Sequence, residues 1–314
     1  EVMRISDRVA ILRKGRYIGT VNTNDVNEQI LTEMMVGAKV SLNIDRTEPV
    51  NQEKRLSVKN LSCYNREGVQ VLKNISFDAY SGEILGIAGI SGCGQKELLE
   101  AIAGLQEVTE DSHVTYIDPD NGNEEELIGM SPRAIKEKGV ALSFVPEDRL
   151  GMGLVSNMGM TDNMMLKDYN EQSGMFINRH DSEVLAARII KELEVVTPGV
   201  STPVGKLSGG NVQKVLVGRE IAASPTVLMT AYAVRGLDIN TSYRIYDLLN
   251  EQKKKGVAVI YVGEDLDVLL ELCDHILVLC SGQVNGYLDA RTTTKEEVGL
   301  KMMYLSKDGG SQDE

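Results

Sequence analysis

Residues 84–103 read ILGIAGISGCGQKELLEAIA, and they decide the fold class. The apolar run Ile84–Ala88 is typical of a buried strand, and Glu97–Ala103 is typical of a helix. Three glycines stand between them. A glycine-rich turn from strand to helix allows backbone N–H groups to surround phosphate oxygens, although an ordinary tight turn would explain the glycines equally well. The stretch predicts an α/β fold with a candidate phosphate loop.

This loop lacks the side chains that usually hold phosphate and metal. The pattern G-x-x-x-x-G-K-[ST] has Lys where Gln95 stands and a hydroxyl where Lys96 stands. Gln95 keeps a donor without charge, and Lys96 removes the hydroxyl that would coordinate Mg²⁺. The Lys96 ammonium could replace the metal and bind phosphate, or it could simply point to solvent. The candidate nucleotide-binding positions here are Gly89, Ser91, Gly92, Cys93, Gly94, Gln95 and Lys96.

A second glycine motif occupies residues 207–217, LSGGNVQKVLV. A Ser-Gly-Gly step before a helical apolar pattern suits a helix N-terminus aimed at an anion, because its N–H groups have no intrahelical partner. A serine-capped helix without a ligand would also explain Ser-Gly-Gly alone. The complete string, between a glycine loop and a later buried strand, favours a phosphate contact. Its candidate residues are Leu207, Ser208, Gly209, Gly210, Asn211 and Gln213.

Composition limits the function classes. The chain has 314 residues, 42% of them apolar, and a net charge of −13. This apolar content supports a sizeable core, and the acidic balance argues against nucleic-acid binding. The four cysteines show no paired spacing, so we expect reduced thiols in the cytoplasm. We find no signal-peptide pattern and no apolar run near 18 residues, so a membrane role would require partner subunits.

Four strings together resemble one family: Pro146–Arg149, Leu207–Lys214, Arg235–Asp238 and Glu264–Asp267. They are similar to ABC (ATP-binding-cassette) ATPases, and most similar to the second cassette of tandem ATPases of bacterial simple-sugar and nucleoside importers. The resemblance covers nearly the whole chain. It implies a P-loop NTPase (RecA-like) core with an antiparallel β subdomain and an α-helical signature subdomain.

The resemblance also implies roles for single positions. The family usually has a Mg²⁺-binding Asp at the place of Ala231 and a water-polarising Glu at the place of Tyr232. A switch His would stand at Glu264, and a Gln at Glu147. Tyr64 stands where an aromatic ring stacks on adenine, or it simply packs in a hairpin. These replacements imply that the cassette's own site is degenerate and does not hydrolyse ATP.

In such ATPases two cassettes close head to tail, so each signature completes the other cassette's ATP site. The resemblance therefore implies that residues 207–217 act in trans on a first cassette of the same polypeptide, with Asp238 in the D-loop that contacts it. Mg²⁺ would bind at that partner site. Further implied partners are transmembrane permease subunits and, indirectly, a solute-binding lipoprotein. The implied location is peripheral, on the cytoplasmic face of the bacterial membrane. Five methionines, Met152, Met158, Met160, Met164 and Met165, are either a permease groove or ordinary core.

The segments Ile5–Arg16 and Leu272–Val284 share one pattern: a helix end, a strand, a turn and a returning strand, each followed by a polar helix. In this family the pattern closes a cassette. We therefore expect residues 1–45 to be the end of a first cassette, 46–55 a linker, and 56–306 the second cassette. Its helical subdomain should span about 147–222, and residues 307–314 should form a disordered tail.

Two other functions remain open at this stage. The chain could be a scaffold cassette that binds no nucleotide, or an autonomous ATPase. The transported solute is not encoded in these motifs, because binding protein and permease select it.

Overall fold

The computed structural model describes residues 2–13, 15–36, 44–49, 52–137, 142–145, 149–166, 169, 178–222 and 225–305. Its centre is a six-stranded sheet in the order β12-β11-β5-β10-β9-β8. All neighbouring strands in it run parallel except β12, which runs antiparallel to β11. The strands are β5 (Ile84–Ala88), β8 (Leu142–Val145), β9 (Val227–Ala231), β10 (Ala258–Val262), β11 (His275–Cys280) and β12 (Gln283–Asp289).

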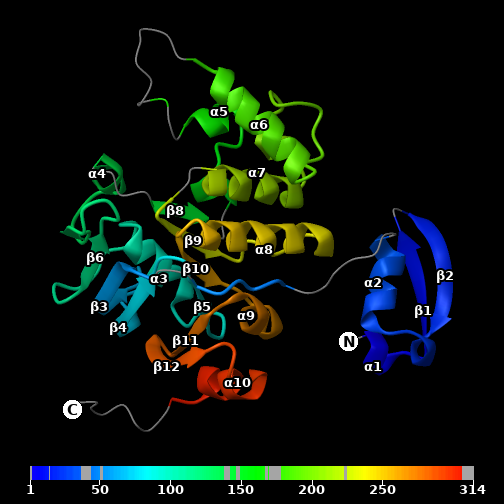
Figure 1. The fold of residues 1–314 in the computed structure, drawn as a ribbon, viewed down its shortest axis with the longest axis horizontal. Helices are drawn as coiled ribbons and strands as arrows, with labels where there is room; N and C mark the ends of the chain where they lie inside the picture. The colour runs from blue at the N-terminus through cyan, green and yellow to red at the C-terminus, as the bar shows by residue number, and fades with distance from the viewer. Residues whose placement is uncertain are drawn as a thin grey trace.

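The central strands are short and apolar because both faces of the sheet are covered. Every residue of β5, β9 and β10 is buried, as expected for a parallel sheet between two layers. Side chains alternate along β5: Ile84 and Ala88 join one core, whereas Leu85 and Ile87 join the other. The layers are visible in Figure 1. The helices packed on this sheet are α3 (Gln95–Ile102), α8 (Ile239–Lys254), α9 (Leu266–Leu272) and α10 (Lys295–Met303).

A second, four-stranded antiparallel sheet covers the α3 side. Its order is β4-β3-β6-β7, and its inner residues, such as Leu56 and Val58, share a core with Leu98 and Leu99 of α3. Its strands are β3 (Lys54–Tyr64), β4 (Gln70–Tyr80), β6 (His113–Ile117) and β7 (Glu124–Glu126). This sheet matches the expected antiparallel subdomain.

A helical region lies beyond the edge strand β8, at the top of Figure 1. Met160 and Met164 are buried in its core, whereas Met158 is 37% exposed. Two of the methionines therefore serve packing, and Met158 is available at the surface. The elements of this region and its approaches are α4 (Pro132–Glu137), a π-helical turn (Arg149–Gly153), α5 (Met160–Met165), α6 (His180–Glu192), a 3-10 turn (Val204–Lys206) and α7 (Gly209–Ala222).

The N-terminal residues form a separate small unit, drawn at the right of Figure 1. A two-stranded hairpin packs against one helix, and a second short helix precedes it. The elements are α1 (Val2–Ile5), β1 (Arg8–Arg13), β2 (Arg16–Asn22), a 3-10 turn (Thr23–Asp25) and α2 (Glu28–Val36).

The segment before β3 is fastened to the cassette. The Arg46 guanidinium donates to the carbonyls of Leu270 and Cys273, at 3.1 and 2.7 Å. Glu53 and Ser81 exchange hydrogen bonds through backbone and side chain. The predicted linker 46–55 therefore has specific contacts along the cassette, and β3 begins inside it at Lys54. The predicted tail 307–314 lies outside the described residues.

No helix in the described part of the chain is long and apolar enough to cross a membrane.

Candidate functional site

The phosphate loop connects β5 to α3 at the carboxyl end of the sheet. Gly92 and Gly94 have φ angles of +87° and +97°, in the left-handed region that other residues avoid. Gly94 directly precedes α3, and a Cβ there would come within 2.6 Å of Leu72. Both conformation and packing therefore demand glycine at Gly94. The backbone of the loop therefore depends on its glycines, independently of the side chains at Gln95 and Lys96.

Gln95 folds back onto this loop. Its side chain is 3% exposed, and its amide Nε2 donates to the Ile90 carbonyl at 3.2 Å. A Cβ on Gly89 would lie 2.6 Å from the same nitrogen. The amide thus occupies the inside of the loop and is satisfied by the loop's own carbonyl. It supplies no charge to balance a phosphate.

Lys96 faces along α3 instead of across the loop. Its ammonium lies 3.7 Å from Glu100 Oε1, one turn away, and the side chain is half exposed. Burial raises the pKa of the Glu100 carboxyl above its usual range, against the attraction of Lys96. Lys96 therefore points to solvent and does not reach into the loop, where it could replace a metal.

The second side of the site is the turn after β9. Ala231 ends the strand, 2% exposed, and Tyr232 follows with φ +50°. The Tyr232 backbone N–H donates to the Val262 carbonyl of β10 at 2.8 Å. Carboxyl ends of parallel strands meet at one edge of a sheet, so this turn lies at the same edge as the phosphate loop. Ala231 presents no oxygen where a metal ligand would be needed.

Arg235 connects Tyr232 and Glu264, two positions at which the sequence predicts a lost catalytic residue. Its Nε lies 3.6 Å from Glu264 Oε1, and its guanidinium lies 5.9 Å from the centre of the Tyr232 ring. The ion pair is more than half exposed on both sides, so water screens it and it contributes little stability. In this arrangement the Glu264 carboxylate faces the Arg235 guanidinium.

The signature begins α7 at Gly209, directly after the exposed Ser208. Asn211 donates to Ser208 Oγ at 2.8 Å. Gln213 is 1% exposed, and its amide donates to the carbonyls of Tyr232, at 3.2 Å, and Ala233. Its side chain therefore faces its own cassette, tying the signature helix to the turn after β9.

Arg149 is a connection that the sequence motifs did not identify as a site residue. Its guanidinium donates to the Arg235 carbonyl at 2.8 Å and to the Gly209 carbonyl at 3.5 Å. The only available signal was its place in the string Pro146–Arg149. The Arg149 guanidinium thus joins the signature to the turn after β9.

The remaining predicted residues are more dispersed. Tyr64 ends β3, is 50% exposed, and its carbonyl accepts a hydrogen bond from Gln106 at 2.8 Å. Asp238 caps α8 by accepting from the Thr241 N–H and hydroxyl, at 3.1 and 2.7 Å. Burial works to raise the pKa of Asp238, but these hydrogen bonds outweigh it and hold the pKa below its usual range. Glu147 lies outside the described residues.

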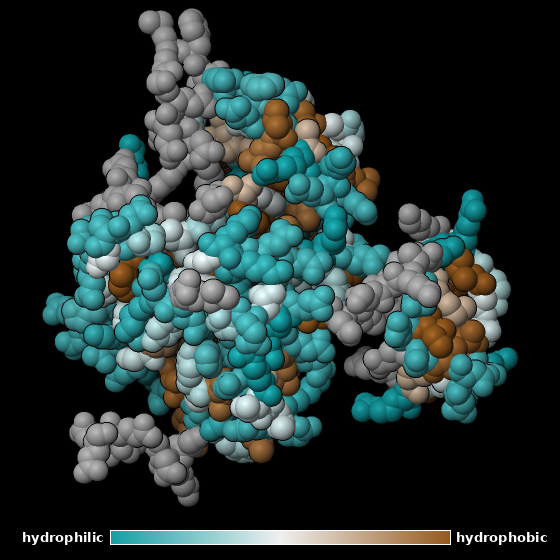
Figure 2. All heavy atoms as spheres, in the orientation of Figure 1, coloured by the Kyte–Doolittle hydropathy of each residue, from teal (hydrophilic) through white to brown (hydrophobic). Residues whose placement is uncertain are grey.

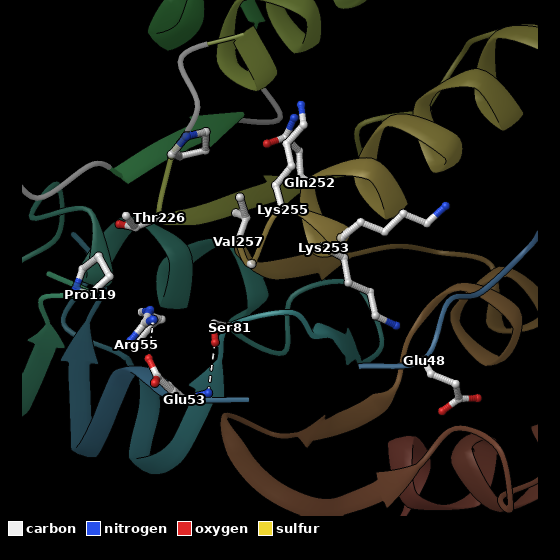
Figure 3. Close-up of a pocket in the computed structure, with 13 residues that line it drawn as sticks. Glu48, Glu53, Arg55, Ser81, Pro119, Thr226, Gln252, Lys253, Lys255 and Val257 are labelled. Carbon is white, nitrogen blue, oxygen red and sulfur yellow. Dashed lines mark hydrogen bonds and ion pairs between the residues drawn. The ribbon is translucent and has the colours of Figure 1, made fainter. Parts of the chain in front are cut away.

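A pocket of about 610 Å³ lies at the amino ends of the central strands β9 and β10 (Figure 3). Thr226 and Val257, which precede β9 and β10, line it together with Arg55 and the lysines at the end of α8. None of the predicted site residues borders it. The pocket is therefore separate from the phosphate loop. Within the described residues, no group of three or more His, Cys, Asp or Glu side chains is placed to hold a metal ion.

Comparison with known proteins identifies the family. The family model described as ABC transporter matches residues 72–230. A glucose import ATP-binding protein of Haloferax volcanii is 36% identical over 96% of this chain and 54% of its own length. A guanosine import ATP-binding protein of Bacillus subtilis is 33% identical over 95% and 57%. A ribose import ATP-binding protein of Clostridium tetani is 36% identical over the same shares.

The chain thus spans little more than half the length of these curated relatives. Among solved structures, a dimeric bacterial ABC transporter cassette matches 76% of this chain and all of its own, with a TM-score of 0.65 and 23% identity. This likeness confirms the predicted P-loop NTPase fold. Cassettes of the family bind ATP, usually with Mg²⁺. The chain therefore belongs to the ABC transporter family, as an ATPase cassette homologous to the ATP-binding subunits of sugar and nucleoside importers.

Proposed function

We propose that this cassette is the second of two in the ATP-binding subunit of a sugar or nucleoside importer. Its own site is degenerate, and its signature completes the ATP site of the first cassette. One contrast carries the proposal. Gln95 and Ala231 lack the charge and the metal-binding side chain that the family motifs have at these positions of its own site, whereas Ser208 and Gly209 stand exposed in a signature that keeps the family motif.

One structural unit, a hairpin followed by a helix, occurs twice in the chain and supports a first cassette before this one. In the N-terminal hairpin Arg8 pairs with Asn22, and in the cassette His275 pairs with Asp289, a constant shift of 267 residues (275 − 8 and 289 − 22). Each hairpin has its irregularity at the equivalent place, after Ile11 and after Val278. Helices α2 and α10 follow at the same shift and have nine residues each.

The capping of these helices repeats too. The Asn27 side chain accepts from the Ile30 N–H at 2.9 Å, and Thr294 accepts from the Glu297 N–H at 3.2 Å, again at the same shift. Matching cap, register and length make a chance resemblance of two hairpins an inadequate explanation. Residues 1–45 therefore suit the end of a cassette, 46–55 the connection, and 56–306 the second cassette.

The N-terminal hairpin also lacks the neighbour that its counterpart has. In the cassette β11 pairs with β5, and Leu279 is completely buried. In the described residues β1 pairs with β2 alone, and the equivalent Leu12 is 66% exposed. Figure 2 shows apolar side chains gathered on this unit. A strand of a first cassette beside β1 would cover them.

The donor set of this cassette's own site does not suit Mg²⁺. Ala231 offers no oxygen, Lys96 replaces the hydroxyl, and Glu264 faces Arg235. The groups that this chain offers to a nucleotide on the other cassette are the Ser208 hydroxyl and the N–H groups at the start of α7. They would bind developing negative charge at a fixed position.

The homologues' function as import subunits supports a permease and a solute-binding protein as partners. The proposed place is the cytoplasmic face of the membrane, reached through the permease. Met158, exposed near the helical region, is available for such a contact.

The test uses the complete natural polypeptide assembled with its permease. Ser208→Arg should abolish ATP hydrolysis, because it blocks the phosphate contact. The matched change Ser201→Arg, in an exposed turn of the same cassette, should leave hydrolysis within about twofold, as surface substitutions usually do. Near-normal hydrolysis by the Ser208→Arg protein would favour a scaffold cassette instead. Turnover by the present chain alone would favour an autonomous ATPase.

A further inference from the structure

The signature contains an amide whose two ends are both engaged inside the cassette. Asn211, on the first turn of α7, accepts the Val196 backbone N–H on Oδ1 at 2.9 Å. Its Nδ2 donates to Ser208 Oγ at 2.8 Å. Asn211 is partly buried, whereas Ser208 is exposed. The amide thus stands between a fixed loop and the serine proposed to contact phosphate.

The chemistry of these bonds determines the direction of the serine proton. A backbone N–H can only donate, so the amide oxygen must face Val196 and the NH₂ group must face Ser208. An amide NH₂ also only donates, so the Ser208 oxygen accepts. The hydroxyl proton must therefore point away from Asn211. Because Ser208 lies at the surface before α7, its remaining donor direction is available to a ligand.

The loop that holds Asn211 is itself fixed to α7. Lys214, one turn further along the helix and 8% exposed, donates through its ammonium to the Glu194 carbonyl at 3.2 Å. Glu194 has φ +49°, so the chain turns sharply just before Val196. Two contacts from one helix face, at Asn211 and Lys214, thus keep the Val196 N–H in place.

We propose that Asn211 is a positioning residue that aims the Ser208 hydroxyl at the phosphate of the nucleotide on the other cassette. This inference rests on the proposed function in trans. Asn211 acts through Ser208, because its oxygen and one N–H of its NH₂ group are engaged inside the cassette. The preorganised donor spares the reorganisation that a freely rotating hydroxyl would need.

Three variants of the complete polypeptide with its permease test the inference: Asn211→Ala, Asn211→Asp and Ser208→Ala. Asn211→Ala frees the hydroxyl and should lower kcat about tenfold, less than the 10²–10³ typical for loss of a whole donor. Asn211→Asp is isosteric and keeps the Val196 bond, but its second oxygen would accept the serine proton. It should therefore lower kcat more than Asn211→Ala does. A purely structural role predicts the reverse order, because Asp restores the loop contact that Ala loses.

The double variant Ser208→Ala/Asn211→Ala separates this inference from the proposed function. If Asn211 acts through Ser208, the second change should lower kcat by less than about twofold in the Ser208→Ala background. A full additional tenfold loss there would overturn the positioning role while leaving the function in trans intact. Unchanged hydrolysis by Ser208→Ala itself would overturn both. Thermal unfolding of each variant checks that the cassette still folds.

Discussion

Two regions of this cassette each lead through glycines into a helix, and they differ in how their side chains are arranged. The loop between β5 and α3 retains its backbone form through Gly92 and Gly94, yet its side chains turn inward or along the helix, as Gln95 and Lys96 show. The start of α7 retains both backbone and side chain, with Ser208 held from behind by Asn211. Under the proposed function, the loop between β5 and α3 keeps a packing role without its chemistry, while the start of α7 supplies the phosphate contact.

The largest expected effect comes from placing the same charge at both regions. Ser208 and Ser91 are exposed serines, one in each phosphate-facing turn. In the complete protein Ser208→Glu should lower ATP hydrolysis at least about 100-fold, because a carboxylate repels phosphate where a donor is required. Ser91→Glu should change it by less than about threefold, since surface substitutions are usually mild. Steady-state kinetics of both variants check the comparison, and equal losses would break it.

A smaller effect is expected at the connection between the signature and the turn after β9. Arg149→Met removes the hydrogen bonds to the carbonyls of Arg235 and Gly209 and keeps an apolar stem. Bonds from a charged donor are worth about 1.5–3 kcal/mol, so kcat in the complete protein should fall by roughly tenfold. The control is Arg244→Met, whose guanidinium donates to Glu192 at the far end of α6. A similar loss there would indicate general destabilisation.

A double substitution in the loop between β5 and α3 tests the same comparison by restoring the usual side chains. Gln95→Lys with Lys96→Ser returns the charge and the hydroxyl, so the isolated chain should bind a fluorescent ATP analogue about tenfold more tightly. Hydrolysis by that chain should stay undetectable, because Ala231 and Tyr232 still lack the carboxylates for metal and water. Measurable turnover would show that the lost loop side chains alone account for the inactivity.

The smallest expected effect is on thermal stability, and it concerns the pair of His275 and Glu83, which is remote from both regions. His275 Nδ1 lies 2.8 Å from Oε1 of the buried Glu83, and this hydrogen bond raises the pKa of His275 despite the opposing effect of burial. A raised folded-state pKa adds stability below the unfolded value of about 6.5, and that stability disappears as pH rises through the folded value. His275 is 33% exposed, so water weakens the pair.

His275→Gln should therefore lower Tm by about 2–3 °C more near pH 5.5 than well above the folded pKa. Thermal unfolding at several pH values measures this difference. ATP hydrolysis by the complete protein should be unchanged relative to stability-matched controls. A larger loss at high pH than at low pH would contradict the assigned direction of the shift.

Local patterns in the sequence predicted the elements well. The run Ile84–Ala88 is β5 itself, because buried strands are continuous apolar runs between turn residues. The helix expected after the loop begins at Gln95, two residues earlier than its apolar pattern indicated, because the two residues added are polar. The hairpin followed by a helix was recognisable in both places where it occurs.

The sequence patterns did not predict the contacts between distant segments. Gln213 belongs to the signature, yet its side chain is buried against the turn after β9. The bond between Asn211 and Val196 and the bonds of Arg149 join segments 15 and 60 or more residues apart. Periodicity describes one element at a time, so it cannot show which distant carbonyl or N–H a polar side chain reaches. These contacts fix the orientation of the polar side chains at the candidate site.

The most direct test of the central claim identifies which turns surround the nucleotide that is hydrolysed. In the complete protein with its permease, a photoreactive ADP analogue would be trapped with vanadate after turnover, crosslinked, and mapped by peptide mass spectrometry. We predict labelling of residues 207–217 in this cassette and no label on residues 84–103. Trapped label on residues 84–103 would contradict the account, because it would place turnover at the loop that has lost its catalytic groups.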